Sequence, residues 1–187
     1  MDEIGVLKNI FTTKITPQTN QDTKKKLAAV LIVIYGKEPT IIMTERPKTM
    51  NHHGGEISFP GGMWKVNDHD LLTTALRETR EEIDLDIKRE QVICQLRPVT
   101  TLNSGFTIIP FISVLDKIPK LTPNSEIEAI LHIPMIKLFK TFEDDQDPSH
   151  KSIQEMYVFR YQNYLIWGAS ARMLKQIMNI LQENRQL

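Results

Sequence analysis

The residues best suited to chemistry form one short acidic run, RETREE at residues 77–82. On a helix, residues three and four positions apart are neighbours, so Glu78, Glu81 and Glu82 can converge, with Glu78 and Glu82 closest together. Crowded carboxylates repel one another, and a divalent cation such as Mg²⁺ or Mn²⁺ relieves that repulsion because it takes oxygen ligands. The run therefore predicts either a metal site or a solvated acidic helix face in which Arg77 pairs with Glu81.

A glycine turn, FPGG at residues 59–62, precedes the acidic run. Its backbone carries little side-chain bulk, so it can approach a ligand or a metal closely. Glycines alone are common in loops, but glycines at a fixed distance before an acidic helix are more specific. Gly61 is therefore a predicted substrate contact.

A cationic loop lies between Thr44 and the glycine turn. Arg46, Lys48, His52 and His53 form the densest group of cations and histidines before the acidic run, which suits contact with a phosphate. Arg46 is favoured over Lys48 because a guanidinium can hold a phosphate with two parallel hydrogen bonds. The alternative is a polar surface loop without a ligand.

Residues 62–85 resemble the Nudix box, G-x5-E-x7-R-E-U-x-E-E-x-G-U, in which U is aliphatic. The later part of the box matches at Arg77, Glu78, Glu81, Glu82 and Leu85. Fourteen residues separate Gly62 from Arg77, one more than in the commonest box, and this longer spacing resembles the coenzyme A diphosphatase branch of the family. In this alignment Asp68 is the counterpart of the first acidic position.

The resemblance to this branch continues on both sides of the box, from about Leu27 to the last helix. Residues 44–62, TERPKTMNHHGGEISFPGG, are similar to the branch's second motif, L-L-T-x-R-S-x3-R-x3-G-x3-F-P-G-G. Glu126-Ile127 leading to Pro134, and IWGASARML at residues 166–174, resemble further segments. Within the last of these, Trp167 is interpreted either as a buried core residue or as a ring that stacks on adenine.

The sequence departs from the family pattern at four positions. Asp84 replaces the box glycine just past the helix end, where a left-handed backbone is expected, and Asp tolerates that geometry better than most residues. In the second motif, Pro47, Asn51 and Glu56 stand where Ser, Arg and Gln are usual. These exchanges alter charge in the recognition loop, so they bear on the substrate more than on the catalytic helix.

The resemblance implies a metal-dependent hydrolase that cuts a diphosphate bond. The metal would be held by Glu78 and Glu82 with assistance from Glu81, and Arg77 would orient these carboxylates. Glu126 is the first candidate for the general base, although it could equally be an exposed strand residue. With coenzyme A as substrate, the products would be adenosine 3′,5′-bisphosphate and 4′-phosphopantetheine, and Arg46 is expected to contact the 3′-phosphate.

The identity of the general base, the substrate and the presence of catalysis each have an alternative. Glu128 is the second candidate for the general base. The same metal helix could serve another Nudix substrate such as ADP-ribose or a nucleoside triphosphate. A catalytically inactive nucleotide-binding module is a third alternative, but a module that only binds has no reason to retain crowded carboxylates.

Alternating and helical patterns predict the elements that position these residues. Helices are expected at residues 2–13, 70–83 and 168–183, and strands at 28–35, 40–44, 56–59, 92–99, 108–115, 126–132 and 155–160. The first two strands are separated by a short turn and predict a hairpin. We therefore expect an α/β fold of the Nudix type, a mixed β-sheet between helical layers, with a helix and linker at 1–26 and the hydrolase domain at 27–187.

Composition restricts the class of partner. The chain has 187 residues, with 23 Lys and Arg against 23 Asp and Glu, so no overall positive charge attracts nucleic acid or an anionic membrane. No apolar run is long enough to span a bilayer, and the single cysteine, Cys94, is typical of a reducing cytoplasm. The expected partner is a small diphosphate resembling coenzyme A, and a homodimer is compatible with the sequence.

Overall fold

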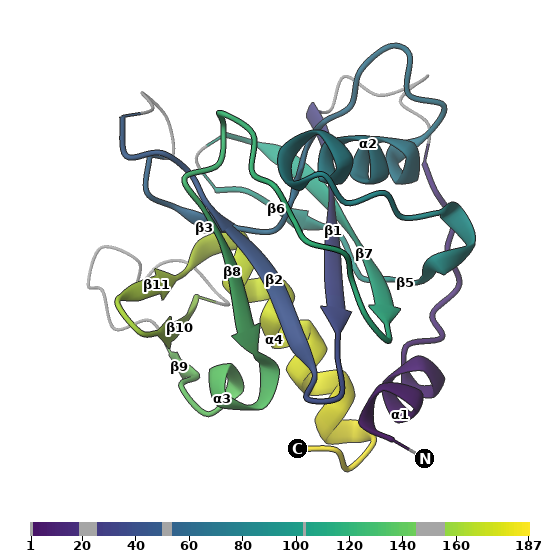
Figure 1. Cartoon of the computed structure of the whole chain (residues 1–187), viewed down its shortest axis with the longest axis vertical. Coiled ribbons are helices and arrows are strands. Elements are labelled where there is room, and N and C mark those ends of the chain that lie inside the picture. The colour runs from purple at the N-terminus through teal and green to yellow at the C-terminus, as the bar shows by residue number, and fades with distance from the viewer. Residues whose placement is uncertain (1, 19–25, 50–53, 103, 145–155) are drawn as a thin grey trace.

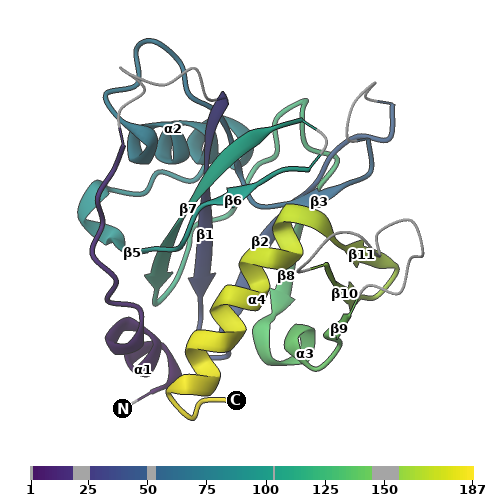
Figure 2. The same ribbon diagram turned by 180° about the vertical axis from the view of Figure 1, so that it is seen from behind.

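A mixed β-sheet lies at the centre of the molecule, with helices on both faces (Figures 1 and 2). The computed structural model describes residues 2–18, 26–49, 54–102, 104–144 and 156–187. The strands of the main sheet are β1 (Lys26–Tyr35), β2 (Thr40–Glu45), β3 (Ile57–Ser58), β4 (Gly61–Met63), β5 (Val92–Gln95), β6 (Val99–Thr100), β7 (Phe106–Leu115) and β8 (Ala129–Pro134). Its main path runs β3-β2-β1-β7-β5, with β4 on β1, β6 on β7 and β8 on β2.

The remaining elements surround this sheet. A smaller three-stranded sheet consists of β9 (Glu143–Asp144), β10 (Tyr157–Tyr161) and β11 (Tyr164–Ile166). The helices are α1 (Glu3–Ile10), α2 (Leu71–Ile83), a 3₁₀ turn η1 (Arg89–Gln91), α3 (Met135–Phe139) and α4 (Gly168–Glu183). Figure 1 shows α2 across one face of the sheet, and Figure 2 shows α4 across the other. The expected α/β fold with a mixed sheet between helices is confirmed.

The central strand β1 explains the two layers. Its side chains alternate between the two faces of the sheet, so Ala29, Leu31 and Val33 pack toward α2 while Ile32 and Ile34 pack toward α1 and α4. Both faces of β1 are buried, as expected for a strand that pairs in parallel with β7 along its whole length. Two hydrophobic clusters therefore sandwich the sheet.

Two expected strands differ in the structure. The strand expected at 92–99 divides into β5 and β6, because Pro98 lies between them and has no N–H to donate to a strand partner. The strand expected from Glu126 begins only at Ala129, because the Asn124 side chain accepts the Glu126 N–H at 2.8 Å and forms a turn. The expected hairpin of β1 and β2 is confirmed, as is the helix at 168–183.

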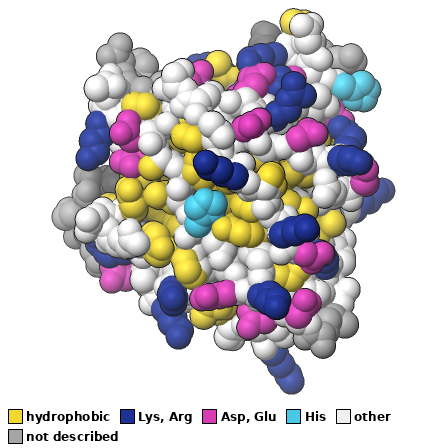
Figure 3. Space-filling view, viewed as in Figure 1, with side chains coloured by type: hydrophobic (Ala, Val, Ile, Leu, Met, Phe, Trp, Pro, Cys, Tyr) yellow, Lys and Arg dark blue, Asp and Glu magenta, His cyan; other side chains and the backbone are white. Residues whose placement is uncertain are grey.

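The surface agrees with the balanced charge of the sequence. Figure 3 shows acidic and basic side chains interspersed over the face seen in Figure 1, without a large area of one sign. Among the described residues, no helix is both long and apolar enough to cross a membrane.

Candidate active site

Helix α2 carries the acidic run and is fixed at both ends. At its start Asp70 is the N-cap and accepts the Thr73 N–H at 2.8 Å. At its end Asp84 has φ 55° and ψ 40°, which is the left-handed conformation expected at this position. The helix buries one stripe against the sheet, and Glu82 lies at the edge of that stripe.

Glu82 is a buried carboxylate with only 4% of its surface exposed. Its Oε2 accepts the Gly61 N–H at 3.0 Å, and Nη2 of Arg46 lies 3.9 Å from its Oε1. Burial raises the pKa of Glu82 to about 7, and the negative charges of Glu78 and Glu126 add to this, against the opposing effects of Gly61 and Arg46. Ionisation of Glu82 in this buried position is therefore unfavourable unless a further positive charge lies beside the carboxylate.

The glycine turn is wedged between β1 and α2. A Cβ on Gly61 would lie 2.3 Å from the Ala29 carbonyl oxygen, and a Cβ on Gly62 would lie 2.8 Å from Cδ and Oε1 of Glu78. Neither position has room for a side chain. The turn itself forms β4, which sequence patterns did not predict, and pairs with β1. The backbone of the turn thus lies directly against the carboxylates of α2.

Arg77 connects the carboxylates of this region. Its Nε and Nη2 donate to the two oxygens of Asp68 at 2.8 and 2.9 Å, and its Nη1 donates to Glu78 at 2.6 Å and Glu81 at 3.1 Å. Burial would raise the pKa of Asp68, but hydrogen bonds from Arg77, the Lys65 backbone and Thr74 outweigh it and lower the pKa to about 2. Asp68 therefore holds Arg77 as a fixed, charged partner.

Lys65 is a cation of this cluster that the sequence analysis did not identify. Its Nζ lies 3.7 Å from Glu78 and 3.5 Å from Glu81. No motif position marked it, since the motif leaves this position between the glycine turn and the helix unspecified. Glu81 is half-exposed and faces both Lys65 and Arg77, so it lies at the outer rim of the site.

The donor set fits a hard divalent cation. Glu78 and Glu82 interact electrostatically beside the two glycines, where the backbone packs against the carboxylates too closely for any side chain. Within the part of the chain that the structure describes, no three His, Cys, Asp or Glu side chains form a metal cage on their own. Mg²⁺ commonly binds through one or two carboxylates and completes its shell with water and substrate phosphates, so two carboxylates are sufficient.

The two candidates for the general base, Glu126 and Glu128, lie in different surroundings. Glu126 is exposed in the turn before β8 and acts on Glu82 as a nearby like charge. The backbone N–H of Glu128 donates to the Glu45 carbonyl at 2.8 Å, and its side chain lines a different depression beside Tyr35 and His132. Of these two, Glu126 is the one that interacts electrostatically with Glu82.

The cationic loop is only partly brought to the site. Arg46 reaches Glu82, as described above, whereas Lys48 is exposed and does not line the neighbouring cavity. His52 and His53, both named from the sequence, lie outside the described residues.

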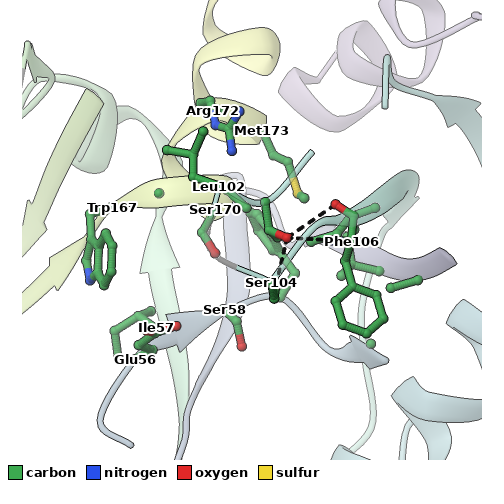
Figure 4. A pocket seen from close by; sticks show the side chains of 18 of the residues that line it. Glu56, Ile57, Ser58, Leu102, Ser104, Phe106, Trp167, Ser170, Arg172 and Met173 are labelled. Carbon is green, nitrogen blue, oxygen red and sulfur yellow. Dashed lines mark hydrogen bonds between the residues drawn. The ribbon is translucent and has the colours of Figure 1, made fainter. Parts of the chain in front are cut away.

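A cavity of about 370 Å³ opens beside the glycine turn (Figure 4). The glycine turn and Arg46 border both the cavity and the carboxylates. Its other walls come from β1, β3, β7, the loop after β6 and the start of α4, and include Ala28, Val30, Ser104, Phe106, Trp167 and Ser170. Trp167 is 39% exposed, so the interpretation of this residue as core is wrong.

The cavity could not be assembled from sequence alone, because its walls lie far apart in the chain. Phe106 and Ile108 are strand residues without any motif. The only sequence feature that linked the start of α4 to the site was the family resemblance at residues 166–174.

A mixed sheet between helices, with an arginine-linked carboxylate helix against a glycine turn, defines a class of α/β proteins whose carboxylates are suited to hold a divalent cation. Comparison with known families narrows this class. Residues 25–156 match the model of the NUDIX domain, and the chain belongs to this family. It is therefore a hydrolase acting on pyrophosphate bonds.

Individual relatives agree with this assignment. The chain is 30% identical over 169 residues to "Uncharacterized Nudix hydrolase NudL" of Photorhabdus laumondii, covering 89% of this chain and 90% of the relative. The protein of the same name from Yersinia pestis is 27% identical, covering 83% of this chain and 79% of the relative.

Among solved structures, a MutT/nudix family protein from Enterococcus faecalis has the same fold. It aligns with a TM-score of 0.60 and 13% identity, covering 88% of this chain and 65% of that one. A MutT protein from Methanosarcina mazei aligns with a TM-score of 0.56 and 12% identity, covering 88% and 99%.

Proposed function

We propose that this protein hydrolyses the diphosphate bond of coenzyme A or its derivatives, releasing adenosine 3′,5′-bisphosphate and 4′-phosphopantetheine or its acyl form. One observation carries the proposal. Residues 44–62 and 166–174, which resemble the coenzyme A branch, come from distant parts of the chain and contribute walls to one cavity beside Glu82. The longer spacing between Gly62 and Arg77 supports the same branch.

Glu78 and Glu82 would hold Mg²⁺ or Mn²⁺, with Glu81 assisting from the rim. When bound, the metal would neutralise phosphate charge and lower the pKa of a coordinated water. Arg77 positions Glu78 and Glu81 through the hydrogen bonds described above, and Asp68 keeps Arg77 in place. Glu126 would accept a proton from the attacking water, because its carboxylate lies near Glu82 and is open to solvent.

Arg46 would contact the diphosphate itself. A guanidinium 3.9 Å from Glu82 is near the reacting phosphates, whereas the expectation from the sequence placed it on the 3′-phosphate at the far end of the substrate. Its positive charge would also offset charge that develops during cleavage.

The direct test is turnover of coenzyme A, acetyl coenzyme A, ADP-ribose and NADH in Mg²⁺ and in Mn²⁺. We expect adenosine 3′,5′-bisphosphate as the product of coenzyme A cleavage, with the highest kcat/KM for the two coenzyme A substrates. ADP-ribose is the closest competitor, since the NUDIX domain of Shewanella oneidensis NrtR was crystallised with that ligand. A higher kcat/KM for ADP-ribose would contradict the proposal.

A further inference from the structure

Lys65 lies at the outer edge of the carboxylate cluster on α2. Its Nζ is 3.7 Å from Oε1 of Glu78 and 3.5 Å from Oε2 of Glu81. Arg77 contacts the same two carboxylates, at 2.6 and 3.1 Å. Two positive charges therefore share carboxylates that a divalent cation would also use.

Arg77 is fixed beside these carboxylates by a buried partner. Its Nε and Nη2 donate to the two oxygens of Asp68, a residue that is only 5% exposed. If the guanidinium moved away, it would leave a buried carboxylate without its positive partner, which is costly. Arg77 is therefore expected to stay in place when a metal binds.

Lys65 is fixed at its backbone, whereas its side chain can move. Its N–H donates to Oδ2 of Asp68 at 3.0 Å, and its carbonyl accepts the Asp68 N–H at 2.8 Å. The side chain is 58% exposed, and its ion pairs are longer than the about 2.7–2.9 Å of a strong charge-assisted hydrogen bond. The ammonium can therefore move into water at little cost and leave the turn intact.

We propose that the Lys65 ammonium competes with the divalent cation: it balances Glu78 and Glu81 when no metal is bound, and the metal displaces it. A dication held by these carboxylates would repel an ammonium that stayed beside them. Lys65 would thus limit the crowding of negative charge before the metal binds, and would lower the affinity for the metal. The family pattern leaves this position unspecified, so it does not require a cation here. The inference rests on the metal site of the proposed function and not on which diphosphate is cleaved.

The test measures metal affinity in three variants. Lys65→Met removes the charge and keeps an unbranched side chain, while Lys65→Arg keeps the charge. Lys37→Met is the matched control, because it makes the same change of charge at an exposed position in the turn between β1 and β2. The dissociation constant of Mn²⁺ is measured by electron paramagnetic resonance without substrate, at low and at high ionic strength.

We expect Lys65→Met to bind Mn²⁺ about two- to five-fold more tightly than the unmodified protein, as suits the loss of partly exposed ion pairs. The difference should shrink at high ionic strength, because salt screens exposed charges. Lys65→Arg and Lys37→Met should stay close to the unmodified protein. An unchanged or weaker affinity of Lys65→Met for Mn²⁺ would overturn the inference.

A second measurement uses the unmodified protein and does not depend on the folding of a variant. Reductive methylation labels accessible lysines, and peptide mass spectrometry reports the rate at each position. The rate at Lys65 should rise when Mg²⁺ is added, because the ammonium is released from its carboxylates, whereas the rate at Lys37 should stay the same. A constant or lower rate at Lys65 would contradict displacement.

Glu78→Gln distinguishes a failure of this inference from a failure of the metal site itself. If Glu78→Gln leaves the affinity for Mn²⁺ unchanged, the proposed metal site is wrong, and the role of Lys65 falls with it. If Glu78→Gln weakens binding but Lys65→Met does not strengthen it, only the role of Lys65 is wrong. A preference for ADP-ribose over coenzyme A would overturn the proposed substrate without affecting either result, since no substrate is present.

Discussion

At the scale of single residues, the burial of Glu82 governs the behaviour of the site. The Gly61 N–H and the Arg46 guanidinium favour the ionised form of its carboxylate. Burial and the two nearby negative charges oppose ionisation. Such groups are expected where a positively charged ligand completes the environment.

Glu82→Gln should lower kcat by orders of magnitude and leave the fold intact, because it removes the negative charge and keeps the shape. The measurement is turnover of coenzyme A in Mg²⁺, accompanied by circular dichroism and thermal melting. Glu90→Gln, which changes an exposed carboxylate on η1, is the control. Near-normal turnover of the Glu82→Gln variant would remove Glu82 from the catalytic site.

The stability of the metal-free protein should fall as the pH rises through about 7. The pKa of Glu82 is raised in the folded protein, so its contribution is fully present below pH 4.5 and is lost as the carboxyl ionises in its buried site. The loss should be at most about 3.5 kcal/mol, given the rise from 4.5 to about 7 and 1.36 kcal/mol for each pKa unit. Urea denaturation in EDTA at several pH values, compared between the native protein and Glu82→Gln, isolates this contribution. Parallel curves for the two proteins would contradict it.

Arg46→Ala should lower kcat/KM equally for coenzyme A and dephospho-coenzyme A, by roughly 1.5–3 kcal/mol, the usual worth of a charge-assisted hydrogen bond. Equal losses are expected because Arg46 lies beside Glu82, where both substrates place the same diphosphate. Steady-state kinetics on the two substrates provide the comparison. A loss restricted to coenzyme A would place Arg46 on the 3′-phosphate, as the sequence first suggested.

At the scale of elements, helix α2 is the part of the site that its sequence specifies most completely. The N-cap, the buried stripe and the left-handed end all follow from local residue types. The end of the helix is its weakest point, since Asp84 adopts a conformation that costs little only for glycine.

Asp84→Gly should therefore stabilise the protein by up to about 1 kcal/mol. The gain is measurable as a higher Tm or a higher urea midpoint, with unchanged turnover. The side chain of Asp84 is exposed, so little contact is lost. A lower Tm would show that this carboxylate makes a contact worth more than the backbone strain.

The helices and strands that the sequence predicted are the long ones with a clear hydrophobic period. Strands β1 and β7 and helices α2 and α4 are long and strongly patterned, so periodicity located them. Short elements were not predicted. β4 occupies a glycine turn, and α3 spans only Met135–Phe139, which is too short to show a hydrophobic period. The acidic run of α2 was predictable because its carboxylates are local in sequence, whereas the cavity depends on tertiary packing between distant strands and α4.

At the scale of the whole molecule, the N-terminal helix belongs to the core. Ile4, Leu7 and Phe11 lie in the same hydrophobic cluster as α4 and the inner face of β1, and Phe11 is only 1% exposed. The segment before the NUDIX match therefore contributes to the packing of the sheet, and its loss should be felt as a loss of stability.

Phe11→Ala should destabilise the protein by about 3–5 kcal/mol, the range for removing a buried phenylalanine. Urea denaturation measures the change. Ile10→Ala provides a comparison one position away, where the side chain is only partly buried and the expected cost is smaller. A cost below about 1 kcal/mol for Phe11→Ala would show that α1 detaches from the domain without consequence.

The parallel pairing of β1 with β7 sets the order in which the protein can fold. Lys26 of β1 pairs with Phe106 of β7, and the glycine turn and α2 lie between them in the chain. Pairing strands so distant in sequence requires closing a long loop, which is slow compared with forming a helix. During synthesis Arg46, the glycine turn and α2 all emerge before β7, whereas Glu126, which acts on Glu82 as a like charge, emerges after it. We therefore expect the surroundings of Glu82 to be completed only after β7 has been synthesised.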